Sequence, residues 1–179
     1  ETRQTVYTLT QYPEHAGLQN LMKDLNMLYQ DKPALYAKDT MPDGFEWMNC
    51  ISAQECRVSY VRKTDRPEDM LLVIANFAGA EQEFMVGVPC AGKYKELLNT
   101  DNQKYCGNAK TATKAIASVE VETDGRENAI SVKVAPLSLI IYSYAPFTEK
   151  EKQEIARKKA EEAARQAAEE AKEAAARAK

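Results

Sequence analysis

The chain has 179 residues, 44% of them hydrophobic, and its 24 Lys and Arg against 27 Asp and Glu give a net charge of −3. This length accommodates one domain with appendages and excludes a large multidomain enzyme. With no basic stripe, no long apolar run and no signal-peptide pattern after Glu1, the sequence predicts a soluble piece of a longer protein that binds neither nucleic acid nor membrane.

The first predicted element is a helix within residues 1–32. Between Gly17 and Gln30 apolar residues recur at steps of three and four, which is typical of an amphipathic helix with one face packed on another element. Leu21, Leu25 and Leu28 belong to that face. Pro33 ends the helix, because a proline pushes the residue before it out of the helical region.

Residues 33–146 carry short β-prone runs separated by turn signals such as Asp43-Gly44 and Asp124-Gly125. No helical pattern lies between successive runs, which favours an antiparallel β-sandwich of about eight strands in two sheets. The continuous apolar run from Met70 to Ala75 predicts a central strand. The expected strands are 45–51, 57–62, 71–77, 84–88, 94–98, 115–122, 129–134 and 137–144.

The tail, residues 147–179, is rich in Ala, Glu, Lys and Arg, and Ile155 is its one large aliphatic residue. Thr148 and Glu151 have the spacing of a capping box, and Glu154 and Lys158 form a well-oriented pair one turn apart. We expect a long helix exposed to solvent, since it has no apolar stripe to bury. An alanine seam that binds a partner helix is the alternative.

Cysteine and histidine usage predicts neither a metal site nor a cofactor. The four cysteines (Cys50, Cys56, Cys90 and Cys106) have no close C-x-x-C pair, and His15 is the only imidazole. A domain of this size does not need disulfides, so we expect four thiols in a cytoplasmic protein. A Cys-His catalytic pair would have to use His15, which precedes the first helix and is far from any cysteine in sequence.

Several short motifs follow one another between about residues 7 and 144, namely Tyr12–Gln19, Lys23–Tyr29, Pro33–Tyr36, Asp43–Trp47, Leu71–Phe77, Gly87–Pro89, Tyr94–Asp101 and Ala135–Ser138. Together and in this order they resemble the C-terminal part of 1,4-alpha-glucan branching enzymes of the alpha-amylase superfamily. The tail has no counterpart in the family pattern.

The resemblance implies a last barrel helix followed by an all-β domain of the alpha-amylase C-terminal type. It also implies a role in glycogen biosynthesis, the cutting of α-1,4 glucan chains and their transfer to α-1,6 links. The catalytic carboxylates of the family lie in the barrel upstream, so no catalytic residue is assigned here and the chain alone should be inactive. Its work would be structural support of the barrel, its intramolecular partner, with auxiliary contact to α-glucan.

Two alternatives remain open at this point. One is a stand-alone carbohydrate-binding module, and the other is a scaffold whose tail helix recruits a partner. The residues proposed for glucan contact are Trp47, Tyr94 and Tyr105, which could stack on sugar rings, and Asp101, which could accept hydroxyl hydrogen bonds. For Trp47 the competing interpretation is a core or barrel-interface residue.

Overall fold

The computed structural model describes residues 7–49, 51, 53–109 and 114–177. The chain divides into two compact units, Glu1–Pro146 and Phe147–Lys179. Within the described ranges no helix is long and apolar enough to cross a bilayer.

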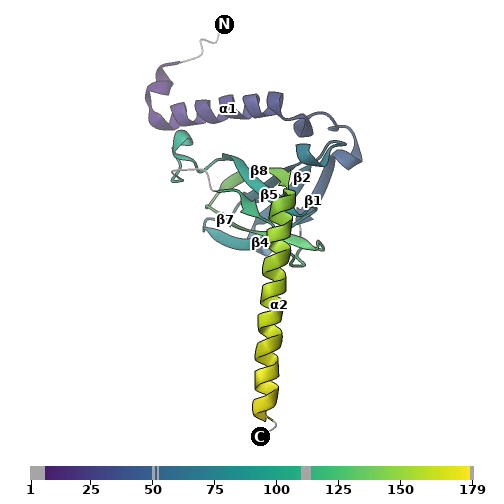
Figure 1. The fold of residues 1–179 in the computed structure, drawn as a ribbon. Helices are drawn as coiled ribbons and strands as arrows, with labels where there is room; N and C mark the ends of the chain where they lie inside the picture. The colour runs from purple at the N-terminus through teal and green to yellow at the C-terminus, as the bar shows by residue number, and fades with distance from the viewer. Residues whose placement is uncertain (1–6, 50, 52, 110–113, 178–179) are drawn as a thin grey trace. The chain divides into compact units, whose positions relative to one another are not determined.

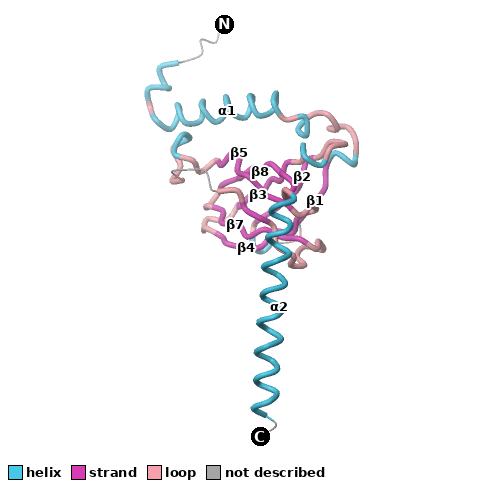
Figure 2. Tube along the Cα trace, in the orientation of Figure 1, coloured by secondary structure: helices cyan, strands magenta, loops and turns pink. Residues whose placement is uncertain are grey.

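The described residues of the first unit form eight strands in two antiparallel sheets. Figures 1 and 2 show the arrangement of the sheets. A six-stranded sheet has the order β1-β2-β3-β8-β5-β6, and β4 pairs with β7 in a second sheet. The bounds are Phe45–Asn49 (β1), Arg57–Arg62 (β2), Leu71–Asn76 (β3), Gln82–Val88 (β4), Gly92–Asn99 (β5), Ile116–Ala117 (β6), Asn128–Val134 (β7) and Ser138–Pro146 (β8). The predicted mainly β, antiparallel sandwich is confirmed.

One hydrophobic core fills the space between the sheets. Alternate residues of β4 and β7, such as Val86 and Val132, face the larger sheet, which contributes Leu72, Ile74 and Tyr142. All six residues of β3 are buried, because its other face meets a second apolar cluster. The predicted central strand is therefore central in the sheet and covered on both faces.

Helix α1 (Pro13–Asp31) lies over that second face of the six-stranded sheet (Figure 1). Leu21, Leu25 and Leu28 are partly buried against a cluster that includes Leu71 and Val73 of β3. The helix begins four residues before the predicted Gly17, since Pro13 fits the first turn, where a backbone N–H is not needed.

The second unit contains helix α2 (Glu149–Arg177). Its predicted capping box is present: the Thr148 amide donates to Glu151 Oε2 at 2.9 Å, and the Glu151 amide donates to Thr148 Oγ1 at 3.4 Å. The Glu154–Lys158 pair forms at 3.2 Å. Side chains from Lys152 to Ala167 are exposed, as expected of a helix without an apolar stripe.

One predicted strand is much shorter than expected. Residues 115–122 form only the two-residue β6, followed by an isolated bridge from Val119 to Ala129. Val119 and Val121 are exposed, so the alternation that predicted a half-buried strand has no sheet face to cover.

Candidate functional site

Trp47 lies on β1, at one edge of the six-stranded sheet, where its side chain is 49% exposed. Its ring meets Phe45 edge to face at a centroid distance of 4.9 Å and Tyr60 at 5.7 Å. Phe45 and Tyr60 are 5.1 Å apart. We call these three residues the aromatic platform. Trp47 pairs with Tyr60 in the β1–β2 register, so the strand pairing itself brings the rings together.

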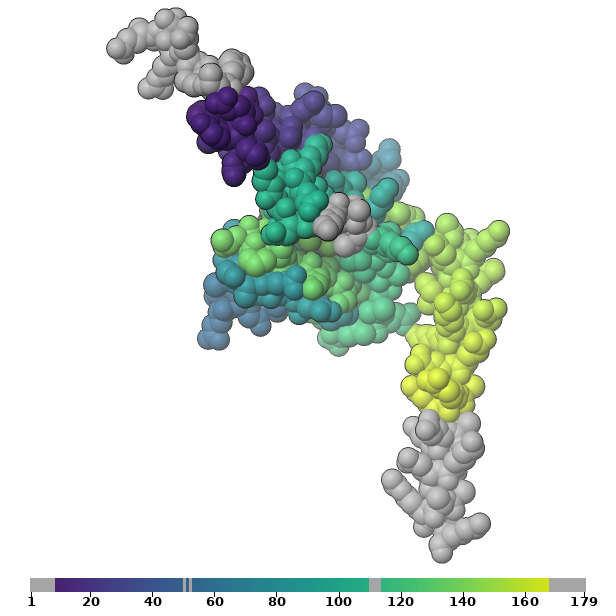
Figure 3. Space-filling view, turned by 90° about the vertical axis from the view of Figure 1, so that its left-hand side faces the viewer, coloured from purple at the N-terminus to yellow at the C-terminus, as the bar shows by residue number. Residues whose placement is uncertain are grey.

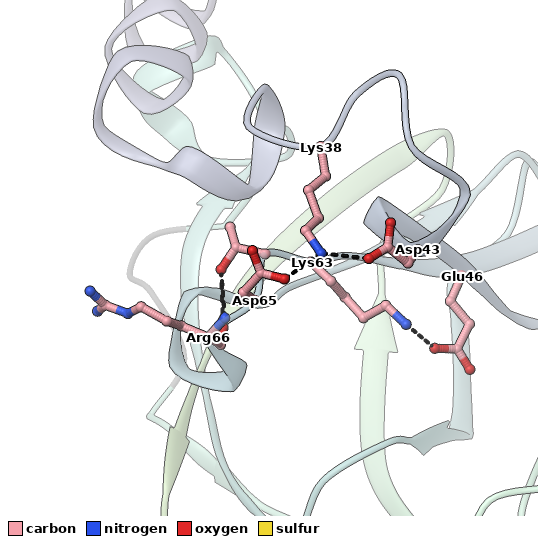
Figure 4. A network of polar contacts seen from close by, with 7 residues as sticks. Lys38, Asp43, Glu46, Lys63, Asp65 and Arg66 are labelled. Carbon is pink, nitrogen blue, oxygen red and sulfur yellow. Dashed lines mark hydrogen bonds and ion pairs between the residues drawn. The ribbon is translucent and has the colours of Figure 1, made fainter.

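Several ion pairs involve residues of β1 and of its neighbouring segments (Figure 4). Lys38 lies between Asp43 and Asp65, with Nζ–Oδ distances of 2.5 Å to each. Lys63 Nζ is 2.6 Å from Glu46 Oε2, and Arg126 pairs with the other oxygen of Glu46. These contacts join β1 and the segment before it to the residues that follow β2, and they join β1 to the turn before β7.

Burial acts to raise the pKa of Glu46, but the hydrogen bond from Lys63 and the charges of Lys63 and Arg126 outweigh it and hold that pKa below its usual value. Glu46 therefore stays ionised at neutral pH and keeps both cations in place.

Tyr105 and Asp101 lie in the loop of residues 101–109 that follows β5, here called the 101–109 loop. Asp101 Oδ1 accepts hydrogen bonds from the amide and side chain of Asn108 at 3.1 and 3.3 Å, which closes the loop on itself. The Tyr105 hydroxyl donates to Asp24 Oδ2 at 2.6 Å. Lys104 Nζ donates to the same oxygen at 2.5 Å. The 101–109 loop therefore binds α1.

Figure 3 shows the 101–109 loop against the N-terminal half of α1. The Cys106 thiol donates to the Pro13 carbonyl at 2.9 Å. A methyl group on Gly17 would lie 2.9 Å from Cys106 Sγ and from the Tyr105 carbonyl, so the close approach requires glycine. Hydrogen bonds from Lys104 and Tyr105 lower the pKa of Asp24. Burial and the bond to Asp24 raise that of Tyr105.

Tyr94 is not an exposed stacking residue, which corrects the expectation from the sequence. Its side chain is 0% exposed in the core between the sheets, and its hydroxyl donates to the Cys90 carbonyl at 2.8 Å. On β5 it occupies an inward position, alternating with the half-exposed Lys93 and the exposed Lys95. A sugar ring could reach Tyr94 only if the core opened.

The fold does not gather the four predicted residues at one place. Trp47 on β1 and the loop after β5 are separated by β2, β3 and β8, which is four inter-strand spacings or about 19 Å. Sequence reasoning missed Tyr60, which completes the platform, and Asp24, which anchors the 101–109 loop. Asp24 did carry a signal: it is a carboxylate on the leucine face of a predicted amphipathic helix.

Comparison with known proteins identifies the β-domain. The family model of the alpha amylase C-terminal all-beta domain matches residues 47–145. This chain belongs to that family. The matched range begins within β1 and ends within β8, so it includes strands of both sheets and two residues of the aromatic platform, Trp47 and Tyr60, but not Phe45.

Relatives extend the match to a named class of enzyme. The chain is 38% identical over 140 residues to the 1,4-alpha-glucan branching enzyme GlgB of Aliivibrio fischeri, which covers 78% of this chain and 19% of that protein. The Prochlorococcus marinus enzyme of the same name is 34% identical over 77% of this chain and 18% of its own length. The Vibrio cholerae enzyme of the same name is 36% identical, over 79% of this chain and 20% of its own length. The chain thus spans about a fifth of these relatives, and the resemblance drawn from the sequence is confirmed.

Within the described residues, no group of three or more His, Cys, Asp and Glu is arranged to hold a metal ion. Cys56, Cys90 and Cys106 are free thiols, and Cys50 lies outside the described residues. Burial and the neighbouring charge of Glu46 raise the pKa of the Cys90 thiol, so that cysteine is protonated at neutral pH and a poor nucleophile.

Proposed function

We propose that this chain is the C-terminal part of a 1,4-alpha-glucan branching enzyme, in which the all-β domain holds the last helix of the catalytic barrel. The observation that carries the proposal is the exposed row of α1. Leu18, Met22 and Tyr29 are 58, 52 and 53% exposed and lie beside the leucines that pack on the sheet. At 100° per residue they occupy one flank of the helix. An apolar row of this kind fits a second packing partner.

Sedimentation velocity tests whether the exposed row of α1 is a packing surface. If the row normally packs on a barrel, the chain alone should self-associate as its concentration rises, and the double variant Leu18→Gln/Met22→Gln should stay monomeric with an unchanged circular dichroism spectrum. Met27→Gln is the matched control, because Met27 is equally exposed on another face of α1. A chain that is monomeric with its row intact would contradict the barrel-helix assignment.

The chemistry is assigned to the barrel rather than to this chain. A retaining transfer needs a carboxylate nucleophile and a second carboxyl as acid and base, about 5 Å apart on a rigid scaffold. Incubation of the chain with amylose should change neither iodine absorbance nor reducing ends relative to a heat-killed sample. Turnover that is lost on heating would place the catalytic pair in this chain and overturn the assignment.

The aromatic platform supports an auxiliary glucan contact at Trp47. Its ring is half exposed and braced edge-on by Phe45 and Tyr60, which suits stacking on the apolar face of a glucose residue. Trp47 is the one tryptophan of the chain, so its fluorescence should shift saturably with maltoheptaose. Trp47→Ala should lose retardation in glycogen-containing native gels, whereas Phe77→Ala, which removes a more exposed aromatic ring outside the platform, should not.

We place the parent protein in the cytoplasm. Three free thiols, two of them exposed, fit a reducing compartment better than an oxidising one.

A further inference from the structure

A groove of about 350 Å³ runs between α1 and β5, on the side of the helix away from the exposed row. Its apolar part comes from Met27, Leu28, Leu97 and Leu98, and its polar part from Asp24, Asp31 and Tyr105. On the helical wheel Asp24 and Asp31 differ by about 20° and lie well over 100° from Leu18 and Met22. A barrel docked on the exposed row would therefore leave the groove open.

The floor of the groove depends on an irregularity in β5. The β5–β8 register shifts between Glu96 and Leu98, as in a β-bulge, so that two successive leucines line the same space. Leu98 is 5% exposed and belongs to the second core, whereas Leu97 is 36% exposed. Met27 on the opposite wall is 58% exposed. Apolar surface is thus held open to solvent by rigid elements on both sides.

The polar groups of the groove are already matched in charge. Asp24 accepts from Lys104 and Tyr105 on the single oxygen Oδ2, and Asp31 Oδ2 is 2.9 Å from Lys32 Nζ. With each carboxylate paired to a lysine, the groove does not favour a charged ligand. It does favour a neutral molecule with apolar faces and many hydroxyl donors, for which carboxylate oxygens are strong acceptors.

We propose that this α1–β5 groove binds a short segment of α-1,4-glucan, as a site separate from the aromatic platform. Asp24 and Asp31 stand two helical turns apart, about 10.5 Å along the axis, which suits an oligosaccharide rather than a single ring. In this arrangement Asp24 Oδ1 and Asp31 accept sugar hydroxyls, Leu97 and Met27 contact the C–H faces, and Tyr105 closes one end. The choice of α-glucan rests on the proposed function.

Methionine methyl NMR on the full chain tests the groove directly. Met22 and Met27 are similarly exposed on the same helix, but only Met27 lines the groove. With 13C-methyl methionine, titration with maltoheptaose should shift the Met27 signal saturably and leave Met22 in place, and cellohexaose should shift neither. A stationary Met27 signal, or an equal response to both sugars, overturns the proposal.

The Trp47 indole signal, followed in the same titration, separates the two glucan proposals. A shift of the Trp47 signal alone would contradict glucan binding in the groove and support binding at the platform. A shift of the Met27 signal alone would support the groove and contradict the platform. Asp31→Asn should weaken the affinity read from the Met27 signal by about three- to tenfold, because the amide oxygen of Asn still accepts a hydrogen bond but one about half as strong as that to a carboxylate. Glu14→Gln, in the first turn of the same helix, is the control and should change nothing. Unaltered affinity in Asp31→Asn would remove Asp31 from the site and contradict the proposed arrangement.

Discussion

The Tyr94 hydroxyl lies inside the core and donates a hydrogen bond to a backbone carbonyl. The contribution of this single residue can therefore be measured as a change in the free energy of unfolding. Tyr94→Phe should lower the free energy of unfolding by about 1 kcal/mol, because the Cys90 carbonyl loses its donor. Tyr94→Ala should cost about 3–5 kcal/mol through the cavity it leaves. Urea unfolding measures both. Tyr144→Phe is the matched control, since its hydroxyl bonds the Ala91 carbonyl at an exposed position and should matter less.

Gly107 lies close to the backbone of the 101–109 loop. A methyl group added there would overlap the Asp101 carbonyl oxygen, whereas one added at Gly79 would meet open space. Gly107→Ala should therefore destabilise the protein by about 1–3 kcal/mol, as overpacking does, and Gly79→Ala should stay within about 0.5 kcal/mol of the parent. Thermal unfolding of the two variants side by side makes the comparison, and equal melting temperatures would contradict the loop geometry.

At the scale of elements, the contact between α1 and the 101–109 loop should depend on pH. Asp24 has a pKa below the unfolded value of 3.8, so it adds stability above that value, and this stability is lost as pH falls through the folded pKa. Asp24→Asn should therefore unfold more easily than the parent at pH 7, with the difference shrinking steadily below about pH 4. Urea titrations at pH 7, 4 and 3 follow this trend. A difference that is the same at pH 7 and pH 3 would show that the charge of Asp24 is not what holds the loop.

The two rows of α1 predict unequal effects of the same substitution. Leu21→Ala and Leu28→Ala remove side chains packed on the second core and should each cost about 2 kcal/mol, the lower end of the range for buried leucines. Leu18→Ala in the exposed row should change unfolding by no more than about 0.5 kcal/mol. Chemical denaturation at a concentration where the chain is monomeric measures all three, and equal costs would mean that α1 does not rest on the sheet by its leucine row.

At the scale of the whole molecule, the tail should fold without stabilising the β-domain. Residues 147–179 form their own compact unit, and intrinsic helix propensity with ion pairs of about 0.2–0.5 kcal/mol each can maintain such a helix. Truncation after Phe147 should move the melting temperature by about one or two degrees while helical circular dichroism falls sharply. A fall of about ten degrees would mean that the tail packs on the fold.

All four cysteines should titrate as thiols in unfolded, unreduced protein. Cys56, Cys90 and Cys106 are free, and the core between the sheets stabilises the domain without cross-links. Freshly prepared chain in denaturant should therefore yield about four thiols per molecule. A count of two or fewer would argue against a reducing compartment for the parent protein.

Local patterns determined most of the elements. The leucine spacing of α1, the uniformly apolar β3 and the Thr148–Glu151 capping box each encode their structure within a few residues, so the helices and seven of the eight strands could be predicted. The segment after Lys114 could not, because alternation predicts a half-buried strand only where a neighbouring strand offers a face. The order of several short sequence motifs along the chain was likewise enough to indicate the family.

Only the tertiary structure decided which side chains can act together. Tyr94 and Trp47 are both aromatic residues in β-prone runs, but strand order and register place one at 0% and the other at 49% exposure. Asp24 and Tyr105 are 81 residues apart in sequence, and their hydrogen bond forms because α1 lies over the sheet whose strand β5 leads into the 101–109 loop. Burial and long-range contact depend on how elements pack, whereas propensity and periodicity act within each element alone. The sequence by itself therefore determined the elements and indicated the family. The packing of the elements determined which side chains form the platform and the groove, and it buried Tyr94.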